Sequence, residues 1–297
     1  MIAVDAHPYL SHWGLQEPPF LLAPDPRFAF ERADHQEGLA RLLFGLTQLE
    51  GLVVITGEIG CGKTMLSQAL STVLAGEGFR TSTLVNPART AAGVLRGLLE
   101  ASGEPVPRVP AAGLAVALRA FVARQTEQGS RTVFVVDEAQ RIDSRALDEV
   151  RMLTNPGDGP IAPAVLLGQP ELSPRITAMP QLAQRVVVRY HMGPMAPDET
   201  SGYLAHRALV AGATRPVFSE RAARAIHAES GGVPRVVSLM AANALFVAYS
   251  RGEELVTADT VIDVAEDRRD VEGASATPRP RSAGLPADNG MQGETGE

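Results

Sequence analysis

The fold is decided by one stretch of sequence, Gly57-Glu58-Ile59-Gly60-Cys61-Gly62-Lys63-Thr64. It matches the pattern G-x-x-x-x-G-K-[ST] at every fixed position. Residues 51–56 before it are mostly apolar and β-branched, which predicts a buried strand. Residues 65–75 after it carry apolar side chains at helical spacing. The order strand, glycine loop, helix predicts a phosphate-binding loop rather than a chance glycine-rich turn.

The residue types in this loop suit a nucleoside triphosphate and its magnesium ion, so we expect ATP and Mg²⁺ as cofactors. Glycines let backbone N–H groups curve around a phosphate, and the positive end of the following helix points at the same phosphate. Lys63 can reach the β- and γ-phosphate oxygens, and Thr64 offers a hydroxyl to Mg²⁺. Lys63 is the only lysine in the chain, and a planar guanidinium cannot replace its compact ammonium.

Composition and charge narrow the class of protein. The chain has 297 residues, of which 45% are hydrophobic and 21% charged, enough for one large domain or two modest ones. The net charge of −7 argues against an evenly basic nucleic-acid binder, although it leaves room for a local arginine patch.

The start of the chain lacks a secretion signal, and the longest apolar tract, residues 236–249, is too short to span a bilayer. With Cys61 as the one cysteine, no internal disulfide can form. We therefore expect a cytoplasmic protein without a transmembrane segment.

A second nucleotide signature follows the predicted strand at residues 131–136, which ends in Asp137 and Glu138. In an open α/β sheet the end of this strand lies beside the phosphate loop. Asp137 can hold Mg²⁺ together with Thr64. Glu138 is long enough to polarise a water molecule for attack on the γ-phosphate.

Four further residues each have a functional interpretation and a plainer one. Gln169, at the tip of the predicted strand 164–168, either reports the γ-phosphate or has no role. Arg185, where a helix passes into a strand, either reaches the nucleotide of a neighbouring subunit or forms a surface salt bridge. Arg235, at a helix start, faces either the phosphates or solvent. Cys61 either has a lowered pKa near the helix start or is simply a small residue at a variable loop position.

The alternation of strands and helices over residues 51–191 predicts a mostly parallel sheet with helices on both faces. After residues 193–197 the composition changes, and we expect only helices, with Asp198 and Ser219 as N-caps. Four such helices are predicted, at residues 198–211, 219–230, 234–250 and 257–267.

We divide the chain into four parts, which are an arm rich in proline and aromatic residues (1–34), a nucleotide-binding core (35–195), a helical lid domain (196–267) and a disordered tail (268–297). The arm is expected to lie on the core that follows it, held by Trp13, Phe20, Phe28 and Phe30. It either covers the adenine edge of the nucleotide or only packs there.

Taken together, these motifs resemble the AAA+ ATPases of the general secretion pathway protein A (ExeA-like) family, with the related transposition ATPases close behind. The resemblance covers residues 9–267 and rests on the phosphate loop and on Gly14–Phe20, Pro24–Phe28, Asp137–Gln140, Leu166–Leu172, Gln184–His191 and Gly231–Arg235. It implies an α/β P-loop fold, an αβα sandwich with a five-stranded parallel sheet and a C-terminal helical lid, with ATP at their junction.

The resemblance also implies roles for single residues and an assembly state. Gln169 looks like the sensor at the strand tip, Arg185 like the arginine finger of a subunit interface, and Arg235 like the phosphate sensor of the lid. A homo-oligomer, either a ring or a filament, is implied. The residues expected to contact the nucleotide are Gly57, Glu58, Ile59, Gly60, Cys61, Gly62, Lys63, Thr64, Met65, Asp137 and Arg235.

These observations predict a Mg²⁺-dependent ATPase whose hydrolysis or ATP-bound assembly controls a partner, as in secretion or envelope assembly. Two alternatives stay open. One is a transposition helper that forms an ATP-dependent filament on DNA, which the acidic net charge disfavours. The other is a slow ATP switch that acts as a scaffold.

Overall fold

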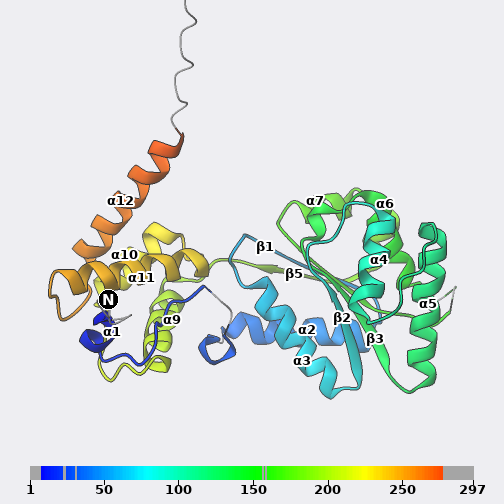
Figure 1. Ribbon diagram of the computed structural model, residues 1–297, viewed down its shortest axis with the longest axis horizontal. Helices are drawn as coiled ribbons and strands as arrows, with labels where there is room; N and C mark the ends of the chain where they lie inside the picture. The colour runs from blue at the N-terminus through cyan, green and yellow to red at the C-terminus, as the bar shows by residue number, and fades with distance from the viewer. Residues whose placement is uncertain (1–7, 23–24, 31, 156, 158, 277–297) are drawn as a thin grey trace, which may run out of the picture.

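Five parallel strands form the centre of the larger unit in the computed structural model, which describes residues 8–22, 25–30, 32–155, 157 and 159–276. Their order is β2-β3-β4-β1-β5, with β1 (Leu52–Gly57) between β4 and β5. The other strands are β2 (Phe79–Leu84), β3 (Arg131–Val136), β4 (Ala164–Gly168) and β5 (Val186–Met192). The predicted five-stranded parallel sheet is therefore confirmed, and all five strands end at one edge (Figure 1).

Helices cover both faces of the sheet because β1, β3 and β4 carry apolar side chains on both faces. On one face, Val53 and Ile55 of β1 pack against α2 (Ala33–Thr47) and α3 (Lys63–Gly76). On the other face, Leu52 and Val54 belong to a core shared with five helices. These are α4 (Ala91–Ala101), α5 (Ala111–Glu127), α6 (Ser144–Leu153), α7 (Leu172–Thr177) and α8 (Pro180–Ala183).

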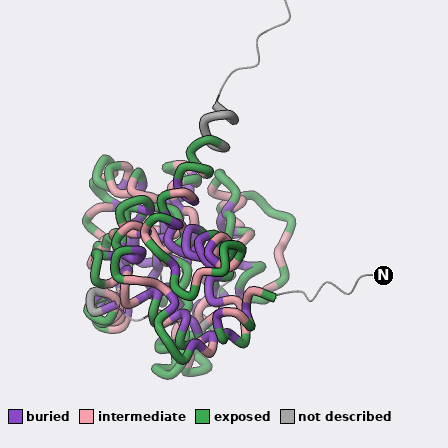
Figure 2. Tube along the Cα trace, turned by 90° about the vertical axis from the view of Figure 1, so that its left-hand side faces the viewer, coloured by how far each residue is buried: buried purple, intermediate pink, exposed green. Residues whose placement is uncertain are grey.

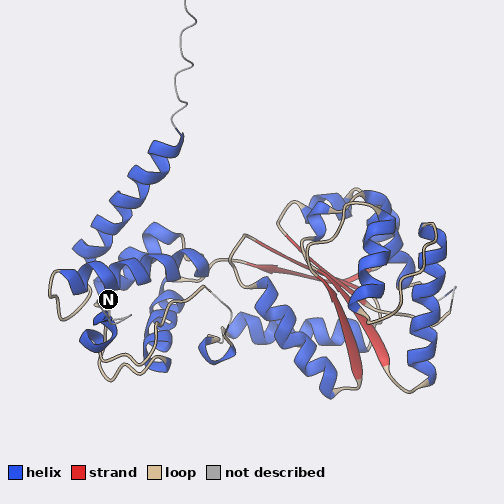
Figure 3. Ribbon diagram, in the orientation of Figure 1, coloured by secondary structure: helices blue, strands red, loops and turns tan. Residues whose placement is uncertain are grey.

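The second unit, which we call the helical lid, consists of α9 (Pro197–Val210), α10 (Glu220–Ser230), α11 (Pro234–Ser250) and α12 (Ala258–Ala276). Figure 3 shows it as an all-helical body beside the sheet. Ser219 caps α10 as predicted, since its side chain accepts a hydrogen bond from the Ala222 N–H. The prediction of Asp198 as a cap is wrong. The N-cap of α9 is Ala196, whose N–H is bonded by the Glu199 carboxylate, and Pro197 takes the first helical position.

The N-terminal arm packs on the helical lid and not on the core that follows it, which corrects the sequence-based expectation. Trp13, in α1 (Pro8–Trp13), is 1% exposed and donates from its indole nitrogen to the Leu245 carbonyl in α11. Phe20 and Phe28, the latter ending the short 3-10 helix η1 (Pro26–Phe28), belong to the same apolar core as α9–α12. Segments from the two ends of the chain thus form one body (Figure 1).

Two further differences concern a helix that the sequence analysis missed and the end of the last predicted helix. Helix α6 was not predicted, although Asp143 caps it and Leu147 and Val150 are buried at helical spacing. The last helix does not stop at residue 267. It continues to Ala276, so the proposed tail boundary at 268 is wrong, and residues 277–297 lie outside the described part of the chain.

The apolar cores of the sheet unit and of the lid with the arm are separate clusters of buried residues. In Figure 2 the buried residues lie mostly inside the molecule and the exposed ones on its outer turns. Within the described residues, no helix is both long enough and apolar enough to cross a lipid bilayer.

Candidate functional site

The glycine loop leaves β1 at the edge of the sheet where all the strands end, and its backbone needs glycine at two positions. Gly60 has a φ of +86° and Gly62 a φ of +101°, in the left-handed region that L-residues avoid. A Cβ on Gly60 would lie 2.5 Å from the Cβ of Arg235. The Arg235 N–H donates to the Gly60 carbonyl at 3.3 Å. The first turn of α11 therefore rests directly on the loop, and the predicted role of Arg235 toward phosphates stays a prediction.

Lys63 is the first residue of α3 and is 7% exposed. Its ammonium donates to the carbonyl oxygens of Gly57, at 2.7 Å, and Glu58, at 2.9 Å. The only lysine of the chain is thus held against the loop by two backbone oxygens, and an ammonium has three N–H donors to offer.

Thr64 and Asp137 come together across the loop. The Thr64 hydroxyl donates to the Asp137 carboxylate at 3.3 Å, and the same carboxylate accepts the N–H of Glu138 at 2.8 Å. Among the described residues, no group of three or more His, Cys, Asp or Glu side chains could hold a metal ion alone. A hydroxyl and a carboxylate oxygen are, however, the hard donors that Mg²⁺ prefers, and this ion usually takes its other ligands from water and phosphates. The residues present therefore fit Mg²⁺ bound together with a nucleotide.

Glu138 stands immediately after Asp137 with a left-handed backbone, at φ +53°. Its carboxylate accepts a hydrogen bond from the Gln140 amide at 2.8 Å. The Gln140 amide oxygen accepts the backbone N–H of Gln169 at 3.1 Å. The structure thus links the two predicted strand tips through a residue that the sequence reasoning did not select.

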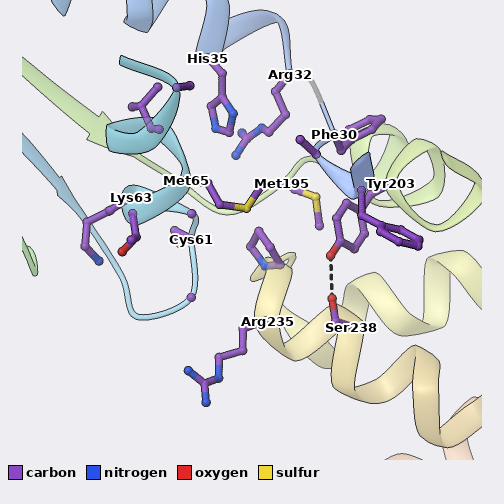
Figure 4. A pocket seen from close by; sticks show the side chains of 18 of the residues that line it. Phe30, Arg32, His35, Cys61, Lys63, Met65, Met195, Tyr203, Arg235 and Ser238 are labelled. Atoms are coloured by element: carbon purple, nitrogen blue, oxygen red, sulfur yellow. Dashed lines mark hydrogen bonds between the residues drawn. The ribbon is translucent and has the colours of Figure 1, made fainter. Parts of the chain in front are cut away.

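A cavity of about 570 Å³ lies between the phosphate loop, α2, the arm and the helical lid (Figure 4). The loop residues from Ile59 to Met65, Asp137, Glu138 and Arg235 line one end of it. The other end is lined by residues that the sequence analysis did not select, including Arg32, His35, Leu39, Tyr203, Arg207 and Ser238. No local motif marks these residues, because the arm, α2 and the lid meet only in the folded chain.

Buried arginines hold the arm in place at this cavity. Arg207 in α9 donates to the carbonyls of Pro19, at 2.5 Å, and Leu21, at 3.2 Å, and also to the Tyr203 hydroxyl. Arg32 pairs with Glu199 and donates to carbonyls of the segment that joins β5 to α9. The arm and the lid are therefore fixed to each other along one wall of the cavity.

Cys61 is 1% exposed within the apolar core beneath the loop. Burial raises the pKa of its thiol, although the nearby Lys63 ammonium opposes this. Of the two interpretations of Cys61, the lowered pKa is therefore wrong, because desolvation outweighs the Lys63 charge and the hydrogen bond to the Glu58 backbone.

Two of the selected residues lie away from the cavity. Gln169 is not among the described residues that line it, although its N–H reaches Gln140. Arg185 precedes β5 at the end of the sheet where the strands begin, opposite to the end that carries the phosphate loop. There its carbonyl accepts the Leu52 N–H, and its guanidinium donates to the Asn155 side chain at 2.9 Å. The six residues of β1, about 20 Å of extended chain, separate this end from the phosphate loop.

The comparisons with known proteins agree with this geometry. A family model described as an AAA domain matches residues 46–176. The General secretion pathway protein A of Aeromonas hydrophila is 34% identical over 255 residues, which are 84% of this chain. The chain carries an AAA domain and is similar to this ExeA-like relative over most of its own length. It spans 46% of the length of that curated relative.

Solved structures share the fold of this chain. The ORC2 protein of Aeropyrum pernix, solved in ADPNP–ADP complexes, superposes with a TM-score of 0.64 at 19% identity, covering 85% of this chain and 72% of that one. The ORC1 protein of the same organism, solved in complex with DNA, gives 0.63 at 20% identity, covering 88% and 73%. The predicted P-loop fold with a helical C-terminal region is therefore confirmed.

Proposed function

We propose that this ATPase binds ATP with Mg²⁺ in the cavity at the end of β1 and hydrolyses it in an oligomer, so that the nucleotide cycle controls a partner assembly. The observation that carries the proposal is the 3.3 Å contact between the Thr64 hydroxyl and the Asp137 carboxylate beside a lysine-bearing glycine loop. This arrangement offers backbone donors and one ammonium to phosphates, and two hard oxygens to the metal.

The residues divide between binding and hydrolysis. Lys63 and the loop N–H groups hold the β- and γ-phosphates, and Thr64 and Asp137 hold the metal, which would neutralise phosphate charge when bound. Arg235 reaches the phosphates from the lid, because its helix rests on Gly60. Glu138 takes a proton from the attacking water, and Gln169 senses the γ-phosphate at the tip of β4.

Arg185 completes the site of a neighbouring subunit in this proposal. Arg185 lies where β1 begins, whereas the phosphate loop of the same chain follows the end of β1, and this separation supports a role outside its own cavity. An arginine supplied in this way typically accelerates hydrolysis by about 10³- to 10⁵-fold.

The curated relative is a secretion pathway protein, and a role in secretion or envelope assembly is our first proposal for the partner. DNA is the second, since a protein of the same fold was solved with DNA. ATP-dependent retention on DNA at low salt, lost at high salt, separates the two. A cytoplasmic location stays a prediction from the composition.

Lys63→Ala and Glu138→Gln test the proposal. We expect Lys63→Ala to lose ATP binding in a fluorescent-nucleotide titration. Glu138→Gln should bind ATP with about the parent affinity, but its turnover number should fall by at least about 10²-fold. Omitting Mg²⁺ or adding a chelator should stop hydrolysis by the parent. Parent-like turnover in Glu138→Gln would remove the assignment of the general base.

A further inference from the structure

Gln140 occupies an unusual position between the two strand tips of the site. It lies in the 3-10 helix η2 (Ala139–Arg141), which directly follows Glu138. Its side-chain amide nitrogen donates to the Glu138 carboxylate at 2.8 Å, and its amide oxygen accepts the Gln169 N–H at 3.1 Å. One side chain therefore spans from the proposed general base to the backbone of the proposed γ-phosphate sensor.

The chemistry of both partners determines the orientation of this amide. An ionised carboxylate only accepts hydrogen bonds, and a backbone N–H only donates them. The NH₂ of Gln140 must therefore face Glu138 and its oxygen must face Gln169. A side chain with two acceptors, or with none, cannot make both bonds.

The surrounding structure is shaped to hold the amide in place. Arg175 of α7 donates to the backbone carbonyl of Gln140 at 2.5 Å and to that of Ile142 at 2.7 Å, which fixes the turn against α7. Gly168 ends β4, and a Cβ at that position would lie 2.9 Å from the Gln140 amide oxygen. The glycine therefore leaves the space that the amide occupies.

We propose that Gln140 is a positioning residue that couples Glu138 to the tip of β4. This inference rests on the proposed function, because it takes Glu138 as the general base. Glu138 has a left-handed backbone, and the Gln140 amide restrains the direction of its carboxylate. When a γ-phosphate draws the Gln169 segment toward it, the amide transmits the shift to Glu138. Hydrolysis then depends on Gln140, whereas nucleotide binding does not.

Three substitutions separate this role from simple packing. Gln140→Ala removes the side chain, Gln140→Met keeps a similar length without polar groups, and Gln140→Glu keeps the shape but faces Glu138 with a second carboxylate. The turnover number and the dissociation constant of a fluorescent ATP analogue are measured for each in Mg²⁺ buffer. Gln128→Ala, on an exposed side chain at the end of α5, serves as the matched control.

We expect turnover by all three Gln140 variants to fall about 10- to 100-fold, with Gln140→Glu at least as impaired as Gln140→Ala. The dissociation constant for ATP should stay within about threefold of the parent value, because no phosphate ligand is changed. The Gln128→Ala variant should behave like the parent in both measurements.

Two outcomes overturn the inference. One is parent-like turnover in Gln140→Met or Gln140→Glu while Glu138→Gln is inactive, and this leaves the proposed function intact. The other is a loss of ATP affinity that accounts for the lost turnover. If Gln140→Ala proves unfolded, the Met and Glu variants decide by the same criteria. Parent-like turnover in Glu138→Gln itself contradicts the proposed function instead.

Discussion

At the scale of single residues, the phosphate loop depends on two glycines that have no Cβ, Gly60 and Gly62. The left-handed backbone at Gly60 and Gly62 curves the loop, and the missing Cβ at Gly60 admits the first turn of α11. The motif predicted the backbone requirement, because the pattern itself demands glycine near a phosphate. It could not predict the contact with Arg235, which depends on a helix far away in the sequence.

Gly60→Ala should weaken ATP binding by about tenfold or more and destabilise the fold by about 1–3 kcal/mol. The new methyl group would meet the Arg235 Cβ at 2.5 Å, an atom close to the backbone that cannot rotate away. Nucleotide titration and urea unfolding measure the two effects.

Gly76→Ala is the matched control, because a Cβ at this position in α3 meets nothing within 4 Å. It should leave ATP affinity unchanged and alter stability by less than about 1 kcal/mol, in the stabilising direction. Equal ATP affinities for the two variants would contradict the role of Gly60.

Cys61 should react slowly with thiol reagents in the folded protein. Burial both shields the sulfur and raises its pKa, so at pH 8 the reactive thiolate is scarcer than in the unfolded chain, and labelling is at least about tenfold slower. Since a raised pKa moves the titration upward, the folded-state rate should increase only at pH values above those that activate the unfolded thiol. Labelling with iodoacetamide, with and without denaturant, measures this. Equal rates would show that the loop opens readily.

At the scale of elements, the sequence predicted the strands well and the arm poorly. The strands 131–136 and 164–168 have the predicted bounds, because continuous apolar runs can only be buried between two layers of helices. Helix α6 was missed because its many polar residues obscured the spacing of Leu147, Val150 and Leu153. The arm was assigned to the wrong partner because the hydrophobic effect is non-directional. An apolar side chain such as Trp13 or Phe20 indicates that it will be buried, but not which surface will cover it.

Trp13→Ala should destabilise the helical lid by about 3–5 kcal/mol, because it removes a large buried side chain and the bond to the Leu245 carbonyl. Urea unfolding followed by circular dichroism is the suitable measurement, since Trp13 is the only tryptophan and its loss removes the fluorescence signal. Phe44→Ala, at a side chain 54% exposed on α2, is the control and should cost less than about 0.5 kcal/mol. Similar costs for both would contradict the packing of the arm on the lid.

At the scale of the whole molecule, the two ends of the sheet have different tasks in our proposal. The cavity lies where the strands end, between the core and the lid, whereas Arg185 lies where β1 begins. One chain therefore presents a nucleotide site and an arginine that cannot serve that same site. This geometry supports assembly as a requirement for fast hydrolysis.

Arg185→Ala should reduce steady-state hydrolysis by more than about tenfold and leave ATP affinity unchanged. Lys63→Ala is inactive for the opposite reason, because it lacks the nucleotide but retains Arg185. Mixing the two inactive variants should restore part of the activity, since Lys63→Ala subunits supply Arg185 to the nucleotide of their neighbours. Hydrolysis by Arg185→Ala within tenfold of the parent, or a mixture without recovery, would contradict a role across subunits.

The sequence by itself determined the chemistry that we propose for this protein, because a glycine loop with its lysine and a strand ending in two carboxylates are local patterns with few other uses. It also determined the parallel sheet, since apolar strands alternating with helices have few other ways to bury both faces. Only the tertiary structure decided where the arm packs, that Gln140 joins Glu138 to Gln169, and that Cys61 is buried. Each of these depends on contacts between segments that are distant in sequence. Burial of apolar surface alone would allow many combinations of such contacts, and close packing of the interior selects one of them.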